Sequence, residues 1–90
     1  IVSKTVLASD HAKVVLMALD AGQELSEHTA AMPAVIQLME GQAEVTLGGD
    51  AHRLGGGAWV HMPPHLLHSV RAVTPTILLL TLFKNAGAAS

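Results

Sequence analysis

The feature that most constrains the fold is the regular spacing of short apolar segments along the chain. Segments of four to eight residues rich in Val, Ile and Leu alternate with clusters of Gly, Pro, Asn or Asp about every 8–12 residues, and none keeps the period of an amphipathic helix. This pattern is typical of an antiparallel sandwich or barrel. We expect nine strands, at residues 5–7, 12–19, 24–28, 34–40, 43–47, 52–54, 58–62, 68–72 and 76–83.

Length and composition narrow the classes of protein. The 90 residues suffice for one hydrophobic core, so we expect a single domain over 1–90, with its core at about 6–83 and a loose C-terminal tail at 85–90. A net charge of −2 is too small and of the wrong sign for a nucleic-acid partner. Without cysteine there are no disulfides, thiolate ligands or cysteine nucleophiles.

The most apolar run, at 77–83, is far shorter than the roughly 20 residues of a membrane-spanning helix. No signal peptide is recognisable either. We therefore expect a cytoplasmic protein with no membrane partner.

Two predicted strands are apolar on both faces, at 35–39 and 77–80. A strand in a barrel covers only its inner face, so the outer face of these strands needs a second cover. In so short a chain we expect that cover to be a second subunit, which predicts a homodimer. An N-terminal strand folded over one sheet is the alternative.

Glycine, proline and histidine residues stand at fixed spacings in two groups, which are Gly22, His28 and Gly41 in the first and Gly57, Pro63 and His68 in the second. In this spacing the chain resembles the small single-domain cupins, the type-2 cupins of the RmlC-like jelly-roll family, from about residue 6 to 83. The resemblance implies an all-β fold with a single antiparallel β-barrel of the jelly-roll type.

The same resemblance implies a metal site. The family motifs supply two histidines and a glutamate from the first group and one histidine from the second. These ligands hold Mn, Fe, Ni, Cu or Zn and support dioxygenase-like and isomerase-like chemistry. In this chain Ala30 and Ala34 occupy the slots of the second histidine and the glutamate, which leaves His28 and His68. His65 also replaces a motif glycine.

Two imidazoles alone hold a divalent ion loosely, so a functional site needs a third ligand. Our first candidate is His52, which shares the strand parity of Leu54, a residue expected to face inward. The second is His65, in the turn before His68. The pocket around the histidines is expected to be lined by Ser26, Ala30, Ala34, Ile36, Leu38, His65 and Val70.

Two functions remain open from these residues. The first is a small cupin that binds a divalent metal ion or a small organic ligand inside the barrel, with or without enzymatic activity. The second is a non-catalytic ligand-binding or assembly cupin that has lost its metal site. His28 and His68 favour the first, and Ala30 and Ala34 favour the second.

Overall fold

The computed structural model describes residues 1–84, so the predicted tail at 85–90 lies outside the described residues. The strands are β1 (Val2–Ala8), β2 (Ala12–Leu19), β3 (Glu24–His28), β4 (Ala34–Glu40), β5 (Gln42–Leu47), β6 (Asp50–Gly55), β7 (Trp59–Met62), β8 (His68–Ala72) and β9 (Thr76–Phe83). Every predicted strand is present, and the largest difference is at β1, which begins at Val2 instead of at residue 5. Over residues 1–84 no helix has the length and hydrophobicity that crossing a bilayer requires.

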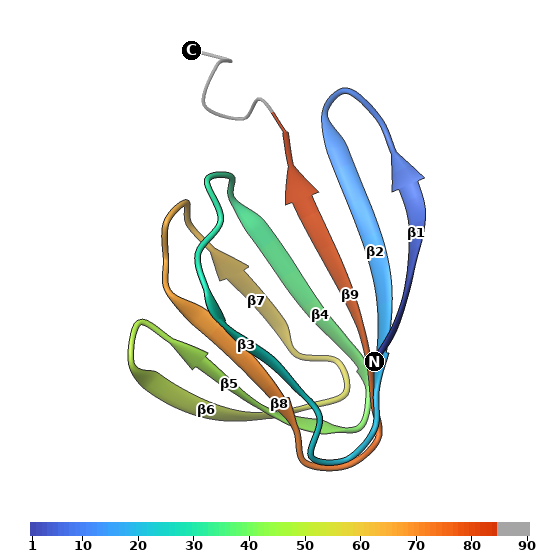
Figure 1. Cartoon of the computed structure of the whole chain (residues 1–90), viewed down its shortest axis with the longest axis vertical. Coiled ribbons are helices and arrows are strands. Elements are labelled where there is room, and N and C mark those ends of the chain that lie inside the picture. The colour runs from blue at the N-terminus through green and yellow to red at the C-terminus, as the bar shows by residue number, and fades with distance from the viewer. Residues whose placement is uncertain (85–90) are drawn as a thin grey trace.

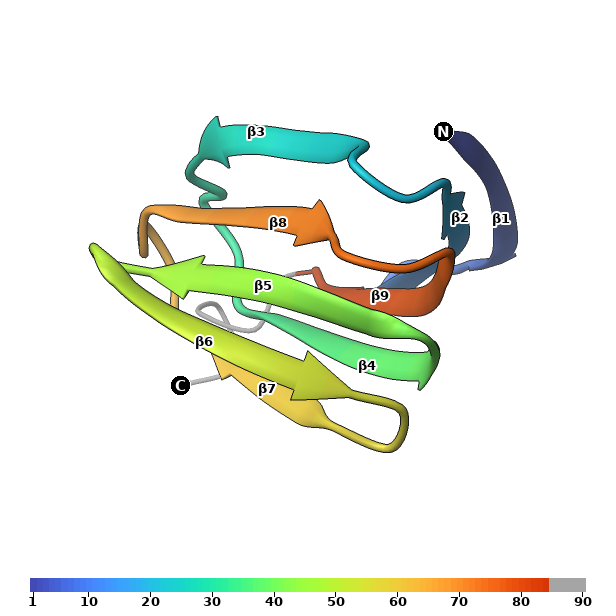
Figure 2. The same ribbon diagram turned by 90° about the horizontal axis from the view of Figure 1, so that it is seen from below.

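The strands form two antiparallel sheets, with the orders β1-β2-β9-β4-β7 and β3-β8-β5-β6 (Figure 1). Figure 2 shows the four-stranded sheet lying across the five-stranded one. The pairs β2–β9, β3–β8, β4–β7 and β5–β6 are nested inside one another, as in a long hairpin folded over into a jelly roll. The predicted all-β jelly roll is confirmed, and its strands form two sheets where the family resemblance implied a single antiparallel barrel.

The core lies between the two sheets. Leu38 and Leu78 are partners in the five-stranded sheet, Val45 and Val70 are partners in the four-stranded sheet, and all four side chains are fully buried. Burying a Val or Leu side chain stabilises the fold by about 1.5–3 kcal/mol. Because either sheet alone would expose its apolar inner face to water, neither sheet is stable without the other.

The outer face of the five-stranded sheet is also apolar. Leu16, Leu79, Gln37 and Trp59 form one cross-strand row on it, from β2, β9, β4 and β7. Trp59 is 60% exposed and Leu16 is 36% exposed. β1 does not cover this face, because it pairs with β2 at the edge of the sheet. The alternative in which the N-terminal strand folds over the sheet is therefore wrong.

Gly41 makes the turn from β4 to β5, where the chain passes from one sheet to the other. Its φ of +89° is in the region that favours glycine. A Cβ atom at this position would lie 2.9 Å from Cα of Thr76 and would collide with the carbonyl oxygen of Pro75. The turn therefore requires glycine for two separate reasons, conformation and space.

Replacing Gly41 tests this account of the turn. We expect Gly41→Ala to lower the free energy of unfolding by about 2–5 kcal/mol, the sum of left-handed strain and a backbone collision. Gly57→Ala is the matched control, since φ is +92° there and nothing lies within 4 Å of the added Cβ. It should cost about 1–2 kcal/mol. Equal losses for both variants in urea denaturation would contradict the collision.

Candidate functional site

His28 and His68 meet at one end of the β3–β8 pair. His28 is the last residue of β3, His68 is the first of β8, and the two are partners in register. Their Nε2 atoms are 3.0 Å apart, and the ring centroids are 4.2 Å apart at an interplanar angle of 63°. Residues forty positions apart in the sequence thus form one histidine pair.

A bulge in β3 turns His28 toward the interior. Leu25 is the partner of Val70 and His28 is the partner of His68, so three steps along β3 match two steps along β8. The extra residue resets the alternation of faces, so Leu25 and His28 lie on the same side of the strand. Strict alternation would have placed Ser26 beside His28.

Backbone carbonyls fix the orientation of both rings. Nδ1 of His28 is 2.7 Å from the carbonyl oxygen of Ser26, and Nδ1 of His68 is 2.8 Å from that of Leu66. A carbonyl oxygen only accepts hydrogen bonds, so each Nδ1 carries the hydrogen and donates it. This leaves a lone pair on each Nε2, and the two Nε2 atoms lie 3.0 Å apart.

Two Nε2 lone pairs at this separation can hold a single cation between them. A shared proton satisfies the pair as one N–H···N hydrogen bond, and a metal ion satisfies it as two N–metal bonds. The carbonyl acceptors on Nδ1 are the outer partners that metal-ligating histidines usually have. The two rings therefore suit a metal ion in tautomer, direction and spacing.

A small cavity adjoins the pair between the sheets. Its volume is about 110 Å³, and it is lined by Met17, Leu25, His28, Ile36, His68, Val70, Leu78 and Leu80. His68 is only 6% exposed, whereas His28 is exposed to solvent. Two imidazoles at the solvent end are thus backed by an apolar interior.

The predicted pocket residues lie in different places. Ile36 and Val70 line the cavity, while Ala34 and Leu38 are buried in the core outside its lining. Ser26 is exposed because of the bulge, and only its carbonyl oxygen reaches the site. Ala30 is half-buried beyond the end of β3 and does not line the cavity.

Four of the lining residues were not anticipated from the sequence. Met17, Leu78 and Leu80 lie on strands predicted correctly, and strand parity with the buried positions would have found them. Leu25 could not have been found in this way, because the bulge that brings it to the side of His28 is not visible in the sequence pattern.

Neither expected third ligand joins the histidine pair. His52 is exposed on β6, and β5 separates β6 from β8, so His52 lies two strands, roughly 10 Å, from the strand of His68. His65 is exposed in the turn, where its backbone N–H donates to the carbonyl of Ala30 at 2.7 Å. No three His, Cys, Asp or Glu side chains within residues 1–84 are grouped to hold a metal ion. The donor set fits a loosely held ion, not a site closed by three or four protein ligands.

The φ of +66° at His65 explains the glycine of the family motif at this position. A left-handed residue is needed in the turn, and histidine tolerates that conformation better than most residues other than glycine, asparagine and aspartate. His65 is thus part of the turn that delivers His68.

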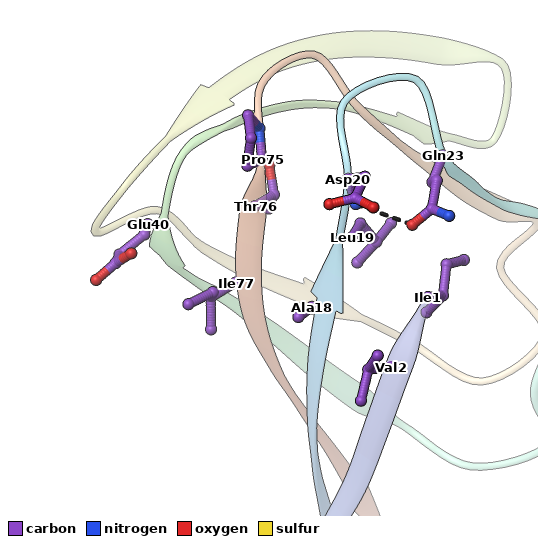
Figure 3. A pocket seen from close by; sticks show the side chains of 10 residues that line it. All are labelled: Ile1, Val2, Ala18, Leu19, Asp20, Gln23, Glu40, Pro75, Thr76 and Ile77. Carbon is purple, nitrogen blue, oxygen red and sulfur yellow. Dashed lines mark hydrogen bonds between the residues drawn. The ribbon is translucent and has the colours of Figure 1, made fainter.

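A second hollow lies at the opposite end of the strands (Figure 3). It has a volume of about 290 Å³ and is lined by residues near the turns after β2 and before β9, among them Leu19, Asp20, Gln23 and Thr76. Its Gln23 Oε1 already accepts a hydrogen bond from the Asp20 backbone N–H at 2.9 Å. Although larger, this hollow contains no histidine, so the cavity at the histidine pair is the candidate site.

Comparison with known proteins agrees with this architecture. A family profile described as a cupin domain matches residues 15–83. The chain is a member of the cupin family. No curated protein matches it.

Solved structures give the same family. An RmlC-like cupin from Desulfovibrio desulfuricans is 32% identical, with a TM-score of 0.83 over 91% of this cupin and 80% of that chain. KdgF from Halomonas sp. is 21% identical, with a TM-score of 0.88 over 98% and 83% of the two chains. Salicylate 1,2-dioxygenase from Pseudoaminobacter salicylatoxidans is 23% identical, with a TM-score of 0.78 over 81% of this cupin and 20% of that chain. The last two show a shared fold only.

The tautomers of the pair can be measured directly. We expect long-range ¹H–¹⁵N correlation spectra to show Nδ1 protonated in both His28 and His68, because each Nδ1 faces a carbonyl oxygen. His52, an exposed histidine on β6, is the control and should show no such preference for Nδ1–H. A proton held mainly on Nε2 of both rings would contradict the arrangement.

Proposed function

We propose that this cupin is a ligand-binding protein in which His28 and His68 hold one divalent transition-metal ion, such as Mn, Fe, Ni, Cu or Zn, through their Nε2 atoms. The single observation that supports this function is the 3.0 Å separation of two Nε2 atoms whose Nδ1 atoms both face carbonyls. It lies within the range of about 3–4 Å expected for two imidazoles on one ion. A small organic ligand would occupy the adjoining cavity.

The two histidines leave most positions around such an ion open. A bound ion would supply positive charge and a Lewis acid at the solvent end of the cavity. Catalytic metal sites usually have three protein ligands, and Ala30 and Ala34 stand where the family has two of its ligands. Binding of a small molecule is therefore better supported than dioxygenase-like or isomerase-like catalysis.

The second candidate is a non-catalytic cupin in which the pair shares a proton in place of a metal ion. The absence of a third donor near the pair within residues 1–84 favours it. In this case the ring geometry is the same, and the cavity binds its ligand without metal. The two candidates differ in one measurable property, the affinity of the protein for divalent ions.

Titration with divalent ions decides between them. Using protein without an affinity His-tag, we expect calorimetry to detect one site. His28→Ala and His68→Ala should each weaken it by more than about tenfold, 1.4 kcal/mol, and the double substitution should abolish it. His61→Ala is the control, because His61 stacks on Trp59 on the outer face of β7 and should leave binding unchanged. Equal binding by the double variant would exclude the histidine pair as the metal site.

We also propose that the cupin forms a homodimer through the outer face of its five-stranded sheet. The support is the cross-strand row of Leu16, Leu79, Gln37 and Trp59, which is apolar except for Gln37 and which β1 leaves uncovered. A large apolar patch on a sheet face is unfavourable in water and is typical of a subunit interface. Val35, at the centre of the same face, is already buried between its neighbours.

A charge placed on this face should separate the subunits. We expect Leu16→Glu to raise the dimer dissociation constant by more than about 100-fold, because an unpaired carboxylate would be buried. Ala51→Glu is the matched control. It adds the same charge, but Ala51 is exposed on the opposite sheet. Light scattering at micromolar concentration gives the molar mass of both variants and of the parent protein. A monomeric mass for the parent protein would contradict the dimer.

A further inference from the structure

We propose that the cavity beside the histidine pair binds a small monocarboxylate with a branched aliphatic body. This inference rests on the histidine pair of the proposed function and on the side chains that line the cavity beside it.

The lining excludes ligands rich in hydroxyl groups. Apart from the two imidazoles, the side chains that line the cavity are Met17, Leu25, Ile36, Val70, Leu78 and Leu80. None of them donates a hydrogen bond, and only the methionine sulfur is a weak acceptor. Each hydroxyl of a sugar or sugar acid would lose water here without gaining a partner, which is unfavourable.

Aromatic stacking is not available either. The only aromatic residues outside histidine are Trp59 and Phe83, and neither lines the cavity. Trp59 is 60% exposed and Phe83 is 37% exposed. A flat ligand such as a sugar ring or a base would find no ring to stack on besides the two imidazoles.

The volume limits the body of the ligand. At about 110 Å³ the cavity is smaller than the roughly 150 Å³ of a dry cavity that holds benzene. An aliphatic body of about four or five carbons therefore fits, and a ring with substituents does not. The side chains from both sheets surround this space, so a branched body fills it better than a linear one of the same size.

The two imidazoles at the solvent end select the head group. His28 and His68 are the only polar side chains in the lining, and no acidic side chain lines the cavity. A carboxylate at this end meets the two imidazoles, or an ion that they hold, while remaining close to solvent through the exposed His28. The aliphatic body then extends toward Leu78, which is completely buried.

Three probes of equal size test the assignment. Isovalerate has the charged head and the branched body, isovaleramide has the body without the charge, and glycerate has the same charge and number of non-hydrogen atoms but carries two hydroxyl groups. We expect NMR titration to show isovalerate binding at least about tenfold more tightly than either of the others. As isovalerate is added, the methyl signals of Leu25, Ile36 and Leu80 should shift until the site is saturated.

Variants of neighbouring residues on β9 locate the site. Leu80 lines the cavity, whereas Leu79 lies on the outer face of the same sheet. We expect Leu80→Phe to fill the cavity and abolish isovalerate binding, and Leu79→Phe to leave it unchanged. Leu80→Ala should shift the preference toward a monocarboxylate one carbon longer, which keeps the assignment testable if the larger side chain disturbs folding.

The outcomes separate this inference from the proposed metal site. If divalent ions bind at His28 and His68 but isovalerate does not bind, the ligand class is wrong and the metal site stands. If isovalerate binds without metal and the double alanine variant loses it, the ligand class stands and the metal proposal fails. Glycerate binding as tightly as isovalerate, or isovalerate binding unaffected by loss of both histidines, would overturn the inference.

Discussion

Burial of two apolar sheet faces against each other is the constraint on which the rest of this molecule depends. Leu38 and Leu78 face the interior from one sheet, and Val45 and Val70 face it from the other. The strands are nested so that β3 lies next to β8 even though they are far apart in the sequence. The histidine pair is a consequence of this nesting, since each ring is carried by one of these two strands. No local segment of the chain could form the pair by itself.

The sequence predicted the strands because apolar spacing and turn residues are local signals. All nine strands follow from them. Gly41 is singled out as a motif glycine, and the structure has both a positive φ and a close backbone contact there. His28 and His68 could also be singled out, because they occupy family ligand positions in two separate motifs. Their meeting follows from pairing that the motif spacing already implies.

The rest of the site could not be predicted for physical reasons. Parity along a strand gives the facing of a side chain only while the strand is regular, and the bulge in β3 exchanges Ser26 for Leu25 at the cavity. Parity also says nothing about distance across a sheet. His52 shares the inward parity of its partner Val45, yet it lies two strands away from His68 and is exposed. Strand order, which decides that distance, is a property of the whole fold.

The way the two rings are held also affects how the site tolerates change. Each imidazole is oriented by the main-chain carbonyl of the residue two positions before it, at Ser26 and at Leu66. Main-chain oxygens are present whatever side chain occupies those positions, so substitutions there can alter the entrance or the packing while the direction of the Nε2 atoms is retained. A cupin of this kind can therefore vary the surroundings of its two imidazoles independently of their alignment. This makes the pair a stable starting point for acquiring a different ligand.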